Sequence, residues 1–238
     1  AVGYRLSAIG ALHLAVPRFS LHILFMRPLF GALALLAAAC VNRPNIIGIQ
    51  NGVTPASIAK ADSGRVPITP ADIDFMSGMI GHHAQAIVMA GWAESHGAGR
   101  AVRALSERIV VGQRDEIGLM QTWLGDRRLP VPEADPTGWR MTMGGQQHTM
   151  IMPGMLTTEQ MKELDAARGR EFDRLFLKYM IQHHEGAIAM VARLFGSNGA
   201  AQDDLVFKFA SDVNVDQITE VEFMKKMLAE IPSPVASD

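Results

Sequence analysis

The internal repeat of this chain is the feature that most constrains its fold. The segment MIGHHAQAIVMA begins at Met79, and MIQHHEGAIAMV begins at Met180. A shift of 101 positions, which is the difference between 180 and 79, also superposes Asp72 on Asp173. Repetition over such a distance indicates two copies of one structural unit that cannot bury its apolar face alone.

Each copy continues into a second segment after a glycine-bearing break, SHGAGR in the first copy and FGSNGA in the second. The second segments, QRDEIGLMQTWL and DQITEVEFMKKML, align Glu116 with Glu220. Each copy is therefore predicted to be a helical hairpin. Two such hairpins would bury their apolar stripes as an antiparallel four-helix bundle. Because we find no alternating strand pattern of useful length, we expect an all-α fold.

The repeats also set the expected boundaries of the bundle, residues 71–228. Its parts are repeat one at 71–125, a methionine-rich linker at 126–157 and repeat two at 158–228, with a tail at 229–238. The first helix should begin at TPAD, where Thr69 is the N-cap and Pro70 the first helical residue. Thr157 or Thr158 should cap a run that leads into the third long helix.

The N-terminal region has the pattern of an export signal. The stretch MRPLFGALALLAAAC runs from Met26 to Cys40, with Arg27 before an apolar run and small residues before the cysteine. This pattern is typical of a bacterial lipoprotein signal, in which the cysteine is lipidated. An ordinary signal and a buried helix or membrane anchor are the alternatives, although the apolar run is shorter than the roughly 20 residues that span a bilayer.

We expect translation to start at Met26, so residues 1–40 would comprise an upstream extension and the signal. Residues 41–70 are rich in Asn, Gly, Pro and Ser and show no sustained period, which predicts a flexible tether. The expected location is the cell envelope, with Cys40 anchored to the outer face of a membrane, or outside the cell.

The paired histidines lie on the apolar side of their predicted helices. At about 100° per residue, the second histidine of each pair falls in the centre of the apolar stripe, one turn after a methionine, and the first falls at its edge. The residues are His83 and His184 in the centre, His82 and His183 at the edge, and Met79 and Met180 one turn before the centre.

Imidazole, thioether and carboxylate groups directed into one interior form a set that can bind a metal ion. His83 and His184 are candidates for inner ligands, and the other histidine of each pair for a ligand or a partner that orients one. Glu116 and Glu220 are candidates for carboxylate ligands or for orienting the histidines. Alternatively, the histidines and glutamates only satisfy one another by hydrogen bonds and specify the register of the helices.

A second cluster of donors lies in the linker. The sequence MTMGGQQHTMIMPGM contains glycine and proline and lacks a helical period, so helical core packing does not account for its methionines. Thioether is a soft ligand that selects Cu(I) or Ag(I). The segment is a candidate secondary metal site, or a hydrophobic loop that covers the bundle. Its donors are Met141, Met143, His148, Met150, Met152 and Met155.

Composition excludes some classes of function. The net charge is -2 and 19% of residues are charged, so no basic surface favours nucleic acid as a partner. The single cysteine excludes a disulfide within the chain. A homo-oligomer is compatible with the sequence.

The MIxHHxxAIxM signature, the QxxExxxM partner helix and the MPGMLTTEQMKEL segment resemble the bacterial domain-of-unknown-function family 305, over about Asp72 to Leu228. The resemblance implies a secreted or envelope-anchored protein with a ferritin-like four-helix fold of two repeats, and copper binding as in some members. The histidine pair of the family corresponds to His82–His83 and His183–His184. Ferritin-like di-iron sites use Glu-x-x-His, whereas this chain has Met-x-x-His-His, which favours copper over iron.

The sequence therefore predicts an envelope-anchored or secreted protein that binds copper, as Cu(I) or Cu(II), for buffering, resistance or delivery. A ferritin-like metal-dependent oxidoreductase is one alternative. A metal-free structural or interaction module of the envelope is the other. The expected partners are the metal ion and, through Cys40, a membrane.

Overall fold

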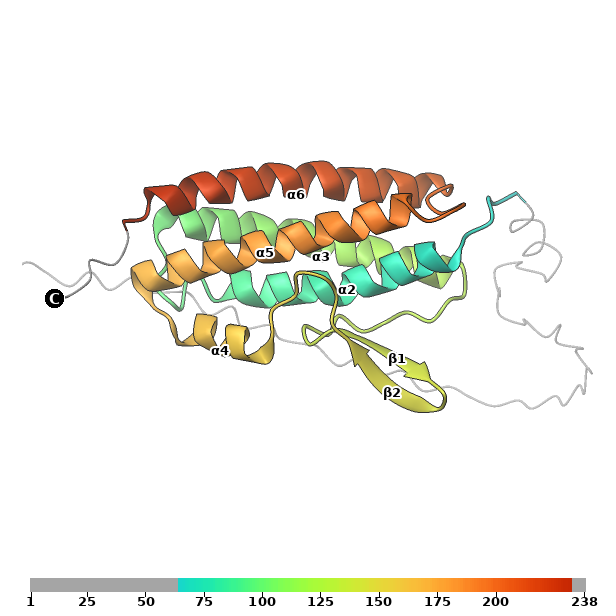
Figure 1. The fold of residues 1–238 in the computed structure, drawn as a ribbon, viewed down its shortest axis with the longest axis horizontal. Coiled ribbons are helices and arrows are strands. Elements are labelled where there is room, and N and C mark those ends of the chain that lie inside the picture. The colour runs from blue at the N-terminus through green and yellow to red at the C-terminus, as the bar shows by residue number, and fades with distance from the viewer. Residues whose placement is uncertain (1–63, 233–238) are drawn as a thin grey trace, which may run out of the picture. The chain divides into compact units, whose positions relative to one another are not determined.

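Five helices and a two-stranded sheet make up the part of the chain that the structure describes, residues 64–232 of a computed structural model (Figure 1). They are, in chain order, α2 (Pro70–Gly91), α3 (Arg100–Asp126), β1 (Trp139–Met143), β2 (Gln146–Met150), α4 (Thr158–Ala166), α5 (Gly169–Phe195) and α6 (Asp204–Glu230). This part of the chain is mostly helical, as the sequence predicted. None of these helices has both the length and the apolar character that a membrane span requires.

Three sequence predictions fall wholly or partly outside the described residues. They concern the signal segment with its start at Met26 and lipidation at Cys40, the tether up to residue 63, and residues 233–238 of the tail.

The four long helices lie side by side, and their contacts join them in a definite order (Figure 1). α2 packs against α3, α5 packs against α6, and α2 and α5 pack against each other. α2 and α5 run in opposite directions, because Gly78 in the first half of α2 lies beside Met190 near the end of α5. Burial of a large apolar side chain contributes about 1.5–3 kcal/mol. The largest fully buried side chains in this interior include Trp123, Phe172 and Phe176.

The two aspartates that the repeat aligns tie each hairpin to the connecting loop of the other. Asp72 accepts the backbone N–H of Thr69 at 2.7 Å, and its second oxygen accepts the N–H of Ala201, just before α6, at 2.7 Å. Asp173 accepts the N–H of Gly99, the N-cap of α3, at 3.0 Å. Burial raises the pKa of the Asp173 carboxyl above its usual value.

The predicted start of the first helix is confirmed, because Thr69 caps α2 in a capping box and Pro70 is its first residue. Thr157 caps α4 in the same way. The run that follows does not continue directly into α5, however. α4 ends at Ala166, and the chain turns at Gly169, whose φ of +57° few other residues adopt.

The prediction that the chain contains no strand is wrong for the linker. β1 and β2 pair as an antiparallel hairpin with Met143 opposite Gln146, which leaves a two-residue turn at Gly144 and Gly145. Both glycines have positive φ, +59° and +81°, as a tight hairpin turn of this kind requires. The Gly-Gly pair was the sequence signal for this hairpin, and the methionines on either side obscured the alternation.

The connection between the two hairpins crosses the face of α2 and α5 that carries the histidines. The connection crosses this face twice, once before the β-hairpin, near Pro136 and Gly138, and once after it, at Met152–Leu156. The second of these segments, Met152–Leu156, is called the strap below. A Cβ at Gly186 would overlap the carbonyl group of Pro153, so the strap backbone lies directly on α5 only because this position is glycine. Gly81 gives similar room on α2, where a Cβ would lie 3.1 Å from the backbone of Gly138.

Two glutamines hold this connection against the helices. Nε2 of Gln85 donates to the carbonyl groups of Pro136 and Leu156, each at 3.1 Å, and its Oε1 accepts the N–H of Leu156 at 2.6 Å. Gln182 donates to the carbonyl of Gly154 at 3.2 Å. In the first copy Gly81 precedes the histidine pair and Gln85 lies two positions after it. In the second copy the order is reversed, with Gln182 before the pair and Gly186 after it. This departure from the repeat lets one connection cover both helices.

Gly186→Ala should destabilise the protein, although alanine is a better helix former than glycine. The new Cβ would push the strap away from α5, and such overpacking costs about 1–3 kcal/mol. Gly118→Ala on the exposed side of α3 is the matched control, because nothing lies within 4 Å of the added Cβ. The control should gain up to about 1 kcal/mol. Urea unfolding measures both values, and equal stability of the two variants would show that the strap does not rest on Gly186.

Candidate metal centre

The four paired histidines meet near the middle of α2 and α5. All four side chains are fully buried, and the rings of His82 and His183 lie with their centroids 3.8 Å apart. The helical wheel placed these two residues at the edge of the apolar stripe, and the structure buries them fully because the connection covers that edge. Nε2 of His82 donates to the strap carbonyl of Pro153 at 3.0 Å.

The second histidine of each pair contacts the aligned glutamate on the neighbouring helix. Nε2 of His83 lies 2.7 Å from Oε2 of Glu116, and Nε2 of His184 lies 2.7 Å from Oε2 of Glu220. The His184 contact has hydrogen-bond geometry, whereas the equally short His83 contact is not aligned as a hydrogen bond. The glutamate side chains are 26% and 27% exposed, so each carboxylate lies between a buried imidazole and the solvent.

Most imidazole nitrogens in this core have no hydrogen-bond partner. They are Nδ1 of His82, both nitrogens of His83, both nitrogens of His183 and Nδ1 of His184. The bond to Pro153 requires a proton on Nε2 of His82, which leaves its Nδ1 as a bare lone pair. A buried polar atom without a partner costs about 1–3 kcal/mol. A set of this size therefore marks a place where a further ligand is expected.

His82 and His183 are held in the neutral form. The pKa of each imidazole is well below its ordinary value of 6.5, chiefly because burial disfavours the charged ring. Repulsion from a neighbouring imidazole is the next cause, from His83 for the first residue and from His82 for the second. A neutral imidazole offers a lone pair to a metal ion without first losing a proton.

The residues present fit a metal ion that accepts nitrogen, oxygen and sulfur. Four methionines that lie one helical turn from the inner histidines or glutamates are fully buried: Met79, Met120, Met180 and Met224. In residues 64–232 no three His, Cys, Asp or Glu side chains already stand where they could hold one ion together. Three or more protein ligands in the core therefore require a donor of another type, such as a methionine sulfur, or a rotation of the imidazoles from their present positions.

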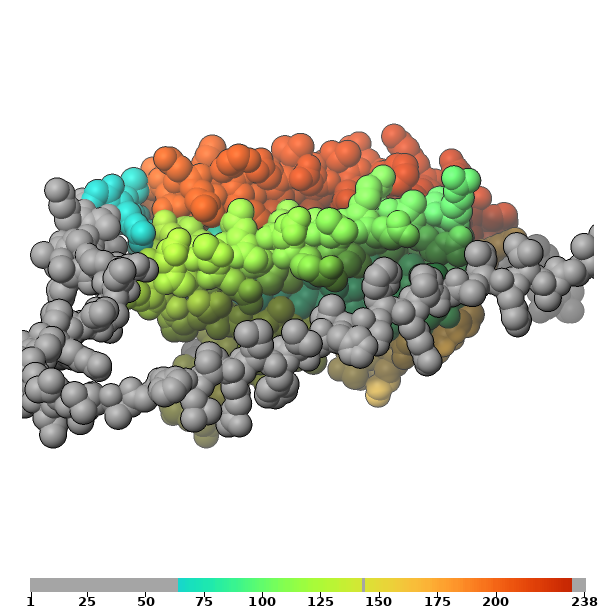
Figure 2. Space-filling view, turned by 180° about the vertical axis from the view of Figure 1, so that it is seen from behind, coloured from blue at the N-terminus to red at the C-terminus, as the bar shows by residue number. Residues whose placement is uncertain are grey.

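A groove between α3 and α6 reaches the two glutamates from the protein surface, on the face that Figure 2 shows. Its volume is about 290 Å³, and Glu116, Glu220, Asp216, Gln113 and Gln217 are among its lining residues. Oε1 of each glutamine is buried and has no hydrogen-bond partner. Desolvation, followed by the negative charges of the two glutamates, raises the pKa of the Asp216 carboxyl above its usual value.

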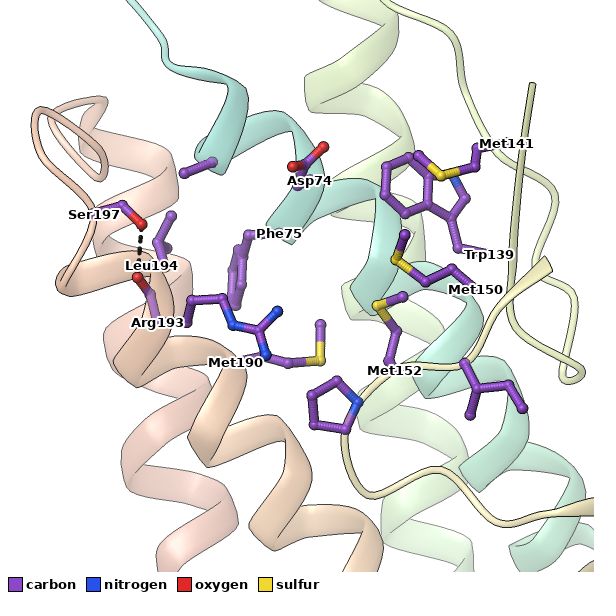
Figure 3. A pocket seen from close by; sticks show the side chains of 13 residues that line it. Asp74, Phe75, Trp139, Met141, Met150, Met152, Met190, Arg193, Leu194 and Ser197 are labelled. Carbon is purple, nitrogen blue, oxygen red and sulfur yellow. Dashed lines mark hydrogen bonds between the residues drawn. The ribbon is translucent and has the colours of Figure 1, made fainter. Parts of the chain in front are cut away.

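A second cavity, of about 540 Å³, lies between the β-hairpin, the start of α2 and the end of α5 (Figure 3). It is called the methionine pocket below. Four thioether side chains line it, together with the rings of Phe75 and Trp139 and the charged groups of Asp74 and Arg193. The methionines come from β1, β2, the strap and α5, and are Met141, Met150, Met152 and Met190.

The structure brings together only part of the methionine-rich site predicted from the sequence. Met141, Met150 and Met152 line the pocket. His148 lies opposite Met141 in the hairpin, so both belong to one face, but its side chain is exposed and does not line the cavity. Met155 is buried beside the pocket without lining it, and its sulfur accepts the backbone N–H of Met152 at 3.4 Å.

Met190 and Trp139 are among the pocket residues that sequence reasoning did not assign to the site, as are Asp74 and Arg193. Met190 was assigned only to the helical repeat, and Trp139 enters the site because it pairs with Met150 across the hairpin. Recognition of the Gly-Gly turn would have placed Trp139 and Met150 opposite each other, on one face of the β-hairpin. Met143 ends β1 opposite Gln146, and its side chain is not described.

The family model described as "Domain of unknown function (DUF305)" matches residues 72–228. No curated protein matches the chain. A solved DUF305 protein from Streptomyces coelicolor, which is assumed to be secreted, is 28% identical with a TM-score of 0.58, and the match covers 71% of this chain and 98% of that one. A DUF305 fragment from Deinococcus radiodurans is 27% identical with a TM-score of 0.55, covering 68% and 98%.

The protein CopM is also similar in structure. Its Cu(I)-bound form is 26% identical with a TM-score of 0.51, and the match covers 66% of this chain and 95% of CopM. Its Cu(II)-bound form matches with the same identity and coverage and a TM-score of 0.52. CopM has also been solved with silver bound. The fold of this chain is therefore shared with a protein that holds copper and silver ions.

The metal-free protein should lose stability as the pH falls from 7.5 to 5. Because the pKa values of His82 and His183 are lowered in the folded state, the unfolded chain binds more protons at and below its ordinary histidine pKa of 6.5. Each histidine then destabilises the fold by up to about 1.4 kcal/mol per pH unit.

Urea unfolding at several pH values measures this slope. His82→Leu/His183→Leu should flatten it, whereas His148→Leu, which removes an exposed histidine, should leave it unchanged. A double variant with the wild-type slope would contradict the assignment of these two residues as neutral and buried.

Proposed function

The chain belongs to the DUF305 family, as its sequence predicted, and we propose that it binds copper outside the cytoplasm for buffering, resistance or delivery. The set of buried imidazole nitrogens without partners, beside two carboxylates and several thioethers, carries this proposal. Similarity to CopM supports it, because CopM is known in Cu(I)-bound and Cu(II)-bound forms.

In this proposal the histidine core is the main copper site. His83 and His184 are the inner ligands, each already facing a carboxylate, Glu116 or Glu220, that can bind the ion or orient the ring. The first histidines of the two pairs, whose rings lie against each other at a tilt, are further ligands or orient the inner ones. Met79 and Met180 supply sulfur from the same buried helix faces. Imidazole accepts copper in both oxidation states, and thioether favours Cu(I).

The methionine pocket is the proposed secondary site, and it suits a soft monovalent ion. Its thioethers come from four different segments, so they surround one space and do not lie along one helix. Asp74 and Arg193 add one negative and one positive charge to the lining, so its selectivity for a soft ion rests on the thioethers. We therefore assign Cu(I) and Ag(I) to this pocket.

A purely structural role for the histidines explains less of the geometry. A role in which each histidine only pairs with a glutamate accounts for the contacts of His83 and His184. It does not account for His183, both of whose ring nitrogens are buried without a partner. A core that served only to specify helix register would gain stability by replacing that ring with an apolar side chain.

We also propose an envelope or extracellular location, with translation from Met26 and lipidation of Cys40. The signal-like stretch supports this part of the proposal, as does the similarity to the Streptomyces coelicolor protein that is assumed to be secreted. We further propose that α2–α3 and α5–α6 are two copies of one repeat that form a ferritin-like antiparallel four-helix bundle. The matched histidine–glutamate contacts and the reciprocal aspartate bonds support it.

His83→Asn/His184→Asn should weaken Cu(II) binding at least tenfold. Even loss of a group that only orients a metal ligand costs about 10–100-fold in affinity, and these residues are the proposed ligands themselves. Competition with a chromogenic chelator measures the affinity, and His148→Asn is the control on an exposed histidine. If a folded variant lacking all four paired histidines retained as much Cu(I) and Cu(II) as the wild type, the proposal would be wrong.

Replacing Met141, Met150 and Met152 together with leucine should weaken Cu(I) and Ag(I) binding about tenfold and leave Cu(II) binding unchanged. Leucine keeps the apolar volume and removes the soft sulfur donor. Met161→Leu is the matched control, because this methionine of α4 packs against the other core cluster and does not line the pocket. Titration of silver followed by calorimetry measures the effect, and an equal response of the triple variant and the control would exclude the pocket as a metal site.

A further inference from the structure

The histidine core has two sides from which a metal ion could approach, and the chain covers only one of them. On the side of α2 and α5, the strap lies directly over the helices, and Gln85 and Gln182 hold the connection in place. On the side of α3 and α6, the groove described above reaches the carboxylates that contact His83 and His184. The second side is therefore open where the first is covered.

We infer that metal ions reach the histidine core through the groove between α3 and α6, and that Asp216 draws cations into it. This inference rests on the proposed copper function and adds its route of access. Glu116 and Glu220 stand between solvent and the inner imidazoles, because each is partly exposed and each has an oxygen 2.7 Å from a buried Nε2. An ion that enters the groove meets these carboxylates before it meets nitrogen.

The polar lining of the groove supplies further oxygen donors for an ion in transit. The side chains of Gln113 and Gln217 are 95% and 97% buried, since 5% and 3% of their surface is exposed. Both line the groove, and Oε1 of each has no hydrogen-bond partner. An amide oxygen is a neutral ligand that can replace part of the hydration shell of a cation. These two atoms would gain a partner if the amides turned toward an ion in the groove.

The charges at the groove predict effects of opposite sign on the rate of access. Asp216, Glu116 and Glu220 together give the lining a negative charge, whereas Arg108 is the cationic residue in the same lining. Charged residues at the mouth of a cleft change association rates by electrostatic steering, and salt screens the effect. Removing Asp216 should slow metal uptake, and removing Arg108 should accelerate it.

Stopped-flow mixing of the metal-free protein with copper(II) sulfate tests this inference. Quenching of tryptophan fluorescence reports the rate, and metal analysis after desalting reports the final occupancy. At low ionic strength Asp216→Asn should load about two- to threefold more slowly, and Arg108→Gln faster by a similar factor. Glu222→Gln, which removes one negative charge from the same helix outside the groove, is the matched control. The differences should shrink in high salt, while the final occupancy stays at the wild-type value.

The outcomes separate the access route from the proposed function. Wild-type occupancy with equal rates for Asp216→Asn and Glu222→Gln would overturn the route and leave copper binding intact. A slower rate for Arg108→Gln would also overturn it, because a structural effect, unlike steering, has no reason to follow the sign of the charge. A wild-type protein that retains no copper would overturn both.

Discussion

The burial of neutral imidazoles without hydrogen-bond partners is the constraint on which the rest of this structure depends. Each unpartnered nitrogen disfavours the folded state by roughly 1–3 kcal/mol, so the surrounding helices must supply a large apolar interior to offset it. They do so with fully buried methionine and aromatic side chains on every long helix. The same burial lowers the pKa values of His82 and His183, so the core keeps unprotonated imidazole lone pairs at neutral pH.

A symmetric pair of hairpins would leave the histidine edge of α2 and α5 exposed, and a single connection has to cover both helices. The connection can do so because glycine and glutamine exchange places between the two copies, with glycine before the first histidine pair and after the second. Gly81 and Gly186 let backbone approach the helices, and Gln85 and Gln182 bond to that backbone. The departures from the repeat are therefore as informative as its matches. Asp216 is another, since the aligned position in α3 is Gly112.

Sequence periodicity was sufficient for the helices and for the pairing of aligned residues. Thr69 capped the first helix as expected, and His184 met Glu220 across its hairpin. Periodicity could not place His82 and His183, because their burial comes from a connection whose path depends on contacts distant in sequence. The hairpin was missed because methionine lacks a strong strand signal, although Gly144 and Gly145 specified its turn. The sequence consequently did not show that Met190 joins Met141, Met150 and Met152 around one pocket.

Three regions around the histidine core carry different sets of donors. Oxygen donors line the groove between α3 and α6, nitrogen and sulfur donors lie together at the centre, and a second set of sulfur donors lines the methionine pocket. The strap connects the last two regions, because Met152 lines the pocket and the next residue, Pro153, accepts the bond from His82. A displacement of the strap would change the shape of the pocket and the hydrogen bonding of an imidazole at the same time. Gly186, which sets how closely the strap approaches α5, therefore influences both donor sets although it carries no donor itself.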